Sequence, residues 1–141
     1  MLGIGAADPL TARIEDGDAR RFAAVFAASG GAPDAARLQT GYLDGAGEGV
    51  AVFTPDRIVS ASNLALAVRA EPDRYAYAIK TCLPLLDDLN RDLRATYLAY
   101  RGLLPKRPLP RVHVVFGAGN SGGTASPEAQ VMGLEVMCGP G

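Results

Sequence analysis

The residues whose types and spacing most suggest chemistry lie in one glycine- and serine-rich segment, residues 117–126. Its first six residues, GAGNSG, match the G-x-G-x-x-G pattern of dinucleotide-binding loops. That pattern requires a following helix, a second parallel strand and an acidic residue about twenty positions on. Only 19 residues follow Gly122, and Pro127 interrupts the start of any helix. The segment therefore does not predict a dinucleotide site.

The same segment contains GNSGG, which matches the G-x-S-x-G pattern around a nucleophilic serine. Such a serine needs a general base that is oriented by a carboxylate. The single histidine, His113, precedes Ser121, whereas an α/β-hydrolase places its histidine after the serine. No acidic residue lies between the two, which excludes the chymotrypsin order. No catalytic residue is predicted in this chain.

Metal ligands are also too few. A zinc site takes three or four ligands from cysteine, histidine and carboxylate side chains. One histidine between valines and two distant cysteines do not supply them, and His113 is expected to be a hydrogen-bonded structural residue. The adjacent Asp87 and Asp88 are expected on a solvated helix face. No metal or other cofactor is predicted for this chain.

The two cysteines, Cys82 and Cys138, leave two alternatives open. In a reducing compartment they would be small buried hydrophobic residues. In an oxidising compartment they would form a disulfide, which is worth roughly 4 kcal/mol for a loop of this length. The first residues do not decide the compartment, because they lack the positive region and the full apolar region of a signal peptide. Residues 1–16 are expected to be a flexible terminus or the remnant of a signal peptide.

The composition describes one ordinary globular domain. The chain has 141 residues, of which 48% are hydrophobic and 21% charged. Fourteen basic and fifteen acidic residues nearly cancel, so neither a nucleic acid nor an anionic membrane surface is an expected partner. No run of about 18 apolar residues predicts a membrane span.

Hydrophobic periodicity divides the domain into a helical region, residues 17–104, and a strand-loop-strand region, residues 105–141. About five helices are predicted in the first. The longest, 85–104, carries an amphipathic stripe that is expected to face the core, formed by Leu86, Leu89, Leu93, Tyr97 and Tyr100.

Two β-strands are predicted after a proline-rich connector, over residues 111–116 and 131–138, with a short helix as the alternative for the second. The fold class is therefore α+β, with helices first and strands last. Two strands do not make a stable sheet alone, so the fold is expected to continue in a larger protein of which this chain is a truncated part. The joining segment, 117–127, is either a mobile hairpin loop or a surface that faces a substrate or partner.

A family resemblance extends over nearly the whole chain. It is carried by the strand at 110–116, by NSGGTAS at 120–126 and by VMGLE at 131–135, and upstream by D-x-x-R-F within 18–26 and by YLD at 42–44. These segments resemble a bacterial family of predicted zinc-dependent proteases. In that family a similar strand, loop and strand stand just ahead of a zincin H-E-x-x-H helix.

The H-E-x-x-H element itself is absent from this chain. The resemblance therefore implies the N-terminal part of a zincin-like domain, which contributes scaffold and cleft edge, while zinc is implied only for the full-length family. The strand around Gly133 and Glu135 would be the sheet edge that a peptide extends by strand addition. Ser121 and Thr124 would donate or accept hydrogen bonds and would not be nucleophiles. The implied cleft residues are Asn120, Ser121, Gly122, Gly123, Thr124, Ser126, Gly133 and Glu135.

Some relatives look exported, so the resemblance favours a periplasmic or secreted location and a disulfide between Cys82 and Cys138. Its expected partners are a missing C-terminal segment and a peptide or protein at the strand edge. An alternative from another class is a non-enzymatic interaction module, in which the open strand edge pairs with a partner chain or with a second copy in a homodimer.

Overall fold

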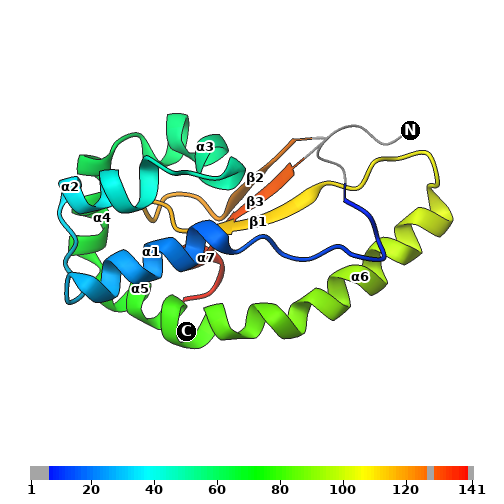
Figure 1. The fold of residues 1–141 in the computed structure, drawn as a ribbon, viewed down its shortest axis with the longest axis horizontal. Coiled ribbons are helices and arrows are strands. Elements are labelled where there is room, and N and C mark those ends of the chain that lie inside the picture. Colours follow the sequence, from blue (N-terminus) through cyan, green and yellow to red (C-terminus); the bar gives the residue numbers. More distant parts are fainter. Residues whose placement is uncertain (1–6, 127–128, 140–141) are drawn as a thin grey trace.

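The computed structural model describes residues 7–126 and 129–139. It confirms the α+β class, because helices come first and a small three-stranded sheet follows (Figure 1). The helices are α1 (Gly17–Ala28), α2 (Ala35–Leu38), α3 (Glu48–Phe53), α4 (Ala61–Ala70), α5 (Pro72–Tyr77), α6 (Leu86–Leu103) and α7 (Leu134–Met137). Shorter turns connect them: the π-helical η1 (Gln39–Leu43), η2 (Thr54–Ile58) and η3 (Ala78–Cys82), and the 3₁₀ turn η4 (Leu83–Leu85). The strands are β1 (Arg111–Val115), β2 (Gly123–Ala125) and β3 (Ala129–Gly133).

Helix starts follow from side chains that accept hydrogen bonds from free backbone N–H groups. The Asp34 carboxylate accepts from the N–H of Arg37 at 2.8 Å, and the Ser60 hydroxyl accepts from the N–H of Asn63 at 3.1 Å. Asp18 caps a helix that is distant from it in the sequence. Although it lies in α1, its carboxylate accepts from the N–H groups at the start of α3, those of Gly47 at 2.9 Å and Val50 at 3.2 Å. This cap fixes α3 against α1.

The sheet has the strand order β1-β3-β2. β1 and β3 are parallel, with Arg111 opposite Ala129, whereas β2 is antiparallel to β3, with Thr124 opposite Val131. The joining segment thus contains a strand of its own, and the two predicted strands do not form a hairpin. The prediction of a strand through 134–138 is wrong, because β3 ends at Gly133 and α7 follows at once.

The segment before α1, within residues 1–16 for which a flexible terminus is predicted, lies along the other edge of β1. Glu15 bridges His113, with hydrogen bonds from Glu15 N–H to the Val112 carbonyl at 2.8 Å and from Val114 N–H to the Glu15 carbonyl at 3.0 Å. Ile14 N–H donates to the Asn90 side chain of α6 at 2.6 Å. Residues 7–16 are therefore held by backbone pairing, while residues 1–6 lie outside the described residues.

An aromatic cluster forms the centre of the core. The Phe22 ring of α1 stacks on Phe116 with 4.5 Å between ring centroids and lies 5.2 Å from Tyr42 and 5.6 Å from Tyr75. All four side chains are fully buried. Because Phe116 directly follows β1, this cluster joins the helices to the end of the sheet where the glycine- and serine-rich segment begins.

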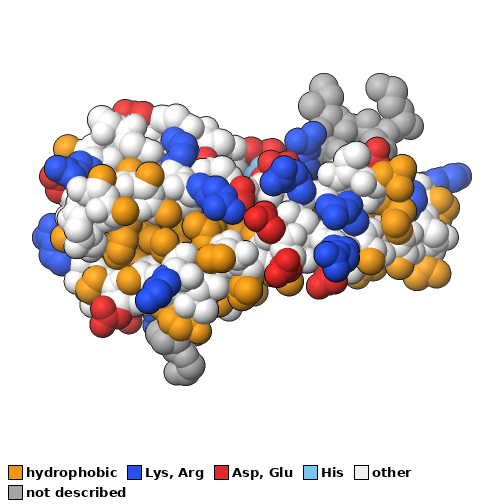
Figure 2. Space-filling model, turned by 60° about the horizontal axis from the view of Figure 1, so that its bottom comes forward, with side chains coloured by type: hydrophobic (Ala, Val, Ile, Leu, Met, Phe, Trp, Pro, Cys, Tyr) orange, Lys and Arg blue, Asp and Glu red, His pale blue; other side chains and the backbone are white. Residues whose placement is uncertain are grey.

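The amphipathic stripe predicted for α6 is only partly in the core. Leu86 and Tyr97 are buried, whereas Leu89 and Tyr100 are 46% and 51% exposed. In Figure 2, hydrophobic side chains are visible on this face among interspersed charges of both signs. The helix runs beside the N-terminal segment, to which Asn90 and Arg94 make hydrogen bonds, and the other side of its stripe is exposed (Figure 1). None of the helices in the described part of the chain is both long and apolar enough to cross a bilayer.

The two cysteines lie at disulfide distance. Cys82 ends η3 and Cys138 directly follows α7, with 6.3 Å between their Cα atoms. Of the two alternatives that the residues left open, the structure has the bridge. It ties the end of α7 to the end of η3.

Candidate functional site

The glycine- and serine-rich segment is fixed at its base by a buried carboxylate. Glu135 is 1% exposed, and its two side-chain oxygens accept hydrogen bonds from the N–H of Gly117 at 3.0 Å and of Gly119 at 2.9 Å. This carboxylate is carried by α7, the single helical turn that follows β3. Gly119 has φ +76°, a conformation that glycine adopts without a steric penalty. The chain therefore bends around the carboxylate at this point.

Two tyrosines hold the carbonyl groups of the same stretch. The Tyr42 hydroxyl donates to the Phe116 carbonyl at 2.6 Å and accepts from the Phe116 N–H at 2.9 Å. The Tyr75 hydroxyl donates to the Gly117 carbonyl at 2.6 Å. Burial raises the pKa of both phenols above their ordinary value of 10.0. Nearby carboxylates, Glu135 among them, raise each pKa further, so both hydroxyls remain donors at neutral pH.

These phenols predict a loss of stability in alkali. The unfolded chain ionises its tyrosines near pH 10, while folded Tyr42 and Tyr75 keep their protons, so stability falls as pH rises from 10 towards the folded pKa values. Each phenol contributes a slope of about 1.4 kcal/mol per pH unit in that window. Urea unfolding at pH 9 and 11 should show a smaller loss for Tyr75→Phe than for the wild type. Tyr100→Phe, at a half-exposed position, is the control, and equal losses in all three proteins would contradict the prediction.

The part of the segment nearest the surface is held by η2. The Arg57 Nε–H donates to the Ser121 hydroxyl at 3.1 Å, and the Arg57 guanidinium lies over the Phe53 ring, 5.5 Å from its centroid. The Asn120 side chain donates in return to the Arg57 carbonyl at 3.1 Å. Asn120 and Ser121 are therefore placed by η2 as well as by the sheet.

β2 is an edge strand with a defined hydrogen-bonding side. Two backbone hydrogen bonds lie at the two ends of its pairing with β3. One runs from Gly133 N–H to the Gly122 carbonyl, and the other from Ser126 N–H to the Ala129 carbonyl. Alternation along an antiparallel pair then directs the N–H and C=O of Thr124 towards β3. Those of the residues on either side, Gly123 and Ala125, point to the outer edge. No strand among the described residues pairs with that edge.

This arrangement corrects the predicted position of the sheet edge. Gly133 lies in β3, the central strand, and Glu135 lies in α7 beneath the loop. A Cβ on Gly133 would lie 2.6 Å from the Ser121 carbonyl oxygen, and one on Gly123 would lie 2.7 Å from the Val131 carbonyl oxygen. Both glycines therefore allow close backbone approach. Of the predicted cleft residues, those at 120–126 lie on or beside the outer edge, and Gly133 and Glu135 support them from within.

The remaining predicted residues shape the ends of β2. The Ser126 hydroxyl accepts from the N–H of Ala129 at 3.1 Å, which closes the turn into β3. Gly122 packs against α7, where a Cβ would lie 3.2 Å from the Met137 sulfur. Beside β2 is a shallow hollow of about 360 Å³ without ionisable lining residues, formed by Gly122, Gly123, Thr124, Ala125, Gln130, Val131, Met132 and Met137.

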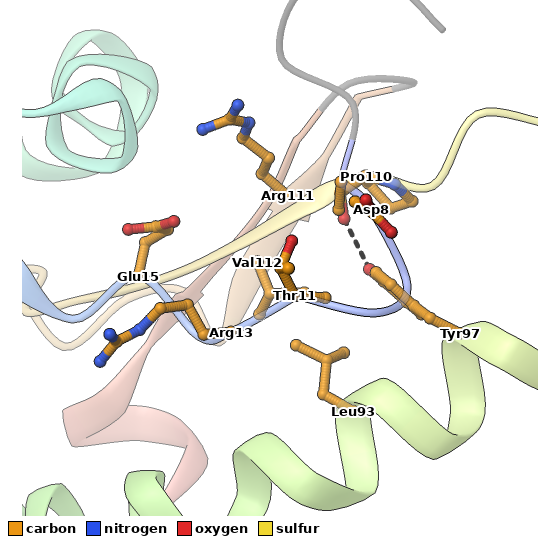
Figure 3. A pocket seen from close by; sticks show the side chains of 11 residues that line it. Asp8, Thr11, Arg13, Glu15, Leu93, Tyr97, Pro110, Arg111 and Val112 are labelled. Atoms are coloured by element: carbon orange, nitrogen blue, oxygen red, sulfur yellow. Dashed lines mark hydrogen bonds between the residues drawn. The ribbon is translucent and has the colours of Figure 1, made fainter.

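Two other hollows do not bring reactive groups together. In the one of about 190 Å³ between the N-terminal segment and α6, the side chains of Arg13, Glu15 and Arg111 point in different directions (Figure 3). Tyr97 at its rim donates to the Pro110 carbonyl at 2.6 Å. The other, of about 400 Å³, is lined by His113, whose Nε2 lies 3.4 Å from a Glu48 oxygen. His113 is a buried strand residue there, and Ser121 is not among the residues that line the hollow.

The resemblance implies zinc for the full-length family, and zinc needs three or four ligand side chains close together. Within residues 7–126 and 129–139, no group of three or more His, Cys, Asp or Glu side chains could hold a metal ion. The side chains in these ranges therefore do not fit a zinc site.

Sequence reasoning missed four residues of this site: Tyr42, Phe53, Arg57 and Tyr75. Tyr42 and Tyr75 showed only the helical spacing expected of core residues, and Arg57 followed the Thr54–Pro55 break without any motif. The roles of Tyr42, Arg57 and Tyr75 depend on partners 42 to 74 positions away. Phe53 acts through Arg57, which approaches this segment from η2. Comparisons with protein-family models, with curated proteins and with solved structures find no match to this chain.

Proposed function

We propose that this chain forms the scaffold and one edge of a peptide-binding cleft, in which an extended peptide pairs with the outer edge of β2. The observation that carries the proposal is the unpaired edge of β2, on which the N–H and C=O of Ala125 point outward. A strand that lacks a partner offers a peptide backbone hydrogen bonds of the kind used in strand addition. The anchors at Glu135, Tyr75 and Arg57 support this edge, because they limit the ordering that binding would require.

By its resemblance, the chain would belong to a zinc-dependent peptidase in which further polypeptide supplies the metal and the catalysis. A periplasmic or secreted location is part of this proposal, and the disulfide between Cys82 and Cys138 supports it, since such bonds persist in oxidising compartments. The coding sequence downstream of residue 141 tests the peptidase assignment. An H-E-x-x-H motif there is expected, and its absence would remove the assignment and leave the peptide-binding edge as a separate question.

The peptide-binding edge is tested by proline substitution. Ala125→Pro removes one outward N–H while the ladder bonds of Thr124 and Ser126 to β3 remain, so only edge pairing should be affected. Binding of a fluorescein-labelled octapeptide of alternating threonine and valine, with blocked ends, is measured by fluorescence polarisation. Ala125→Pro should bind at least about tenfold more weakly than the wild type, because both a hydrogen bond and the close approach of the two strands are lost.

Ala125→Val is the matched control, because valine keeps the N–H and favours strands. It should bind like the wild type. Equal binding by the proline and valine variants would show that the edge is not the site.

The same unpaired edge also favours a second candidate, a non-enzymatic module that pairs with another copy of itself. Two β2 edges related by a twofold axis would form one continuous sheet across the interface. Solution mass distinguishes the candidates. A stable dimer that Ala125→Pro converts to monomer favours self-association, whereas a monomer that binds the octapeptide favours the cleft.

A further inference from the structure

The outer edge of β2 is not equally open along its length. The Ser121 hydroxyl lies 3.3 Å from the Gly123 nitrogen and 3.2 Å from the Gly123 carbonyl oxygen, the two groups that point outward there. It therefore occupies the positions that a bound strand would otherwise take at this residue. None of the residues that the structure describes covers the corresponding groups of Ala125 in this way. A peptide that pairs with Ala125 would reach Ser121 at the Gly123 end of the strand.

Arg57 stands at that end. Its Nε lies 3.1 Å from the Ser121 hydroxyl oxygen, which itself touches the outward groups of Gly123, so the guanidinium lies beside the free edge. The Phe53 ring, 5.5 Å away, supports its flat face. The hydrogen bond from Nε to Ser121 and the contact with the Phe53 ring together orient the guanidinium. Its two terminal nitrogens make no hydrogen bond to the described residues and are the fork that matches a carboxylate.

The surroundings favour an acidic ligand. The hollow on the Met132 and Met137 side of β2 is lined by residues without ionisable side chains, so an apolar ligand residue fits there. Successive side chains of a strand point to opposite faces, so a neighbouring ligand residue would point towards the α3 side of the sheet, from which Phe53 and Arg57 approach. Arg57 thus supplies a positive charge at this end of the edge, and the geometry of its guanidinium suits two oxygens.

We propose that Arg57 selects peptides that carry a carboxylate at the Gly123 end of the β2 edge. This inference rests on the proposed function, since it requires that a peptide pairs with the edge. It names the ligand class of that site: an extended segment with an apolar residue over Met132 and Met137 and a carboxylate against Arg57. The carboxylate comes either from an acidic side chain or from the carboxyl terminus of the peptide.

Three sets of octapeptides test the proposal by fluorescence polarisation. The reference is the end-blocked threonine and valine host. In the second set glutamate replaces each threonine in turn, with a matched glutamine series, and in the third the host has a free carboxyl terminus. The wild type should bind one glutamate peptide, or the free-carboxyl peptide, about tenfold more tightly than its uncharged match. Which of the two does so identifies the source of the carboxylate.

Variants assign the preference to this side chain. Arg57→Met keeps the stem over Phe53 and removes the charge, so the ratio between the affinities for charged and uncharged peptides should fall to about one. Arg57→Lys keeps the charge without the fork and should give an intermediate ratio. Arg69→Met removes a charge from an exposed position on α4 and should leave the ratio unchanged.

Failure of this inference differs from failure of the proposed function. If the wild type binds charged and uncharged peptides equally, or if Arg57→Met keeps the wild-type ratio, the role of Arg57 is overturned while the edge still binds peptide. If the wild type binds no octapeptide at all, the peptide-binding edge itself is overturned. The ratio between the affinities for charged and uncharged peptides is measured on the wild type, so it does not depend on whether a variant folds. That measurement alone can overturn the inference.

Discussion

Replacement of Glu135 by alanine is expected to lower the free energy of unfolding by about 3 kcal/mol, because buried N–H groups lose their acceptor. The two donors are the N–H groups of Gly117 and Gly119, and the carboxylate is 1% exposed, so water does not replace it without rearrangement. Urea unfolding at neutral pH measures the loss. Asp92→Ala, at an exposed position on α6, is the control and should change the free energy by less than about 0.5 kcal/mol.

The size of this effect should depend on pH. Burial raises the pKa of Glu135 above its ordinary value of 4.5, although the N–H groups of Gly117 and Gly119 oppose the shift. The folded protein therefore holds the proton more tightly than the unfolded chain. The contribution of Glu135 is complete below pH 4.5 and declines as pH rises through the folded pKa. Alanine should accordingly cost more stability at pH 4 than at pH 8. A penalty that grows with pH would show that the N–H groups outweigh burial.

Several helix boundaries have causes that lie within a few residues. The Ser60 hydroxyl caps α4, Asp34 opens α2, and the glycines after Ala28 end α1. The β-branched run after Pro110 is β1. In each case an acceptor, a break or a residue type acts on its own neighbours, so one sequence is enough to identify the element.

The candidate site was less predictable, because its geometry comes from contacts between distant segments. Segment 134–138 has the apolar composition of a strand, but the buried Glu135 and the N–H groups it must meet give it a helical turn instead. Nothing in the local pattern marks Glu135 as buried. In the same way, Asp18 resembles an ordinary first-turn residue of α1, yet it caps α3. Its partners are about 30 positions away, beyond the reach of periodicity.

The position of the sheet edge illustrates the same limit. The resemblance implied an edge around Gly133, and the sequence has no signal that distinguishes a central from an outer strand of this length. The parallel pairing of β1 with β3 places β3 in the centre and leaves β2 outside. The residues at 120–126 lie on or beside an edge, and the strand that forms it lies inside the segment predicted as a loop.

Loss of the disulfide is expected to have the largest effect on stability. The double variant Cys82→Ala, Cys138→Ala opens a loop that spans 56 positions, and the free energy of unfolding should fall by about 4 kcal/mol because the unfolded chain gains freedom. Urea unfolding with and without dithiothreitol measures it. The wild type should be destabilised by the reductant, and the double variant should not respond. Two free thiols after oxidative refolding, found by non-reducing mass spectrometry, would refute the bridge.

The disulfide should also act on the candidate edge, because Cys138 lies three positions after Glu135. The bridge holds the end of α7 against η3, and α7 in turn places the carboxylate that accepts from Gly117 and Gly119. Reduction should therefore speed hydrogen exchange at those two amides more than at amides in the middle of α6, which has no such link to the bridge. Uniformly faster exchange would mean that the bridge stabilises the whole fold equally. Exchange that is selective for this bend would show that covalent closure of α7 stabilises the bend at Gly117 and Gly119, from which the segment leads into β2.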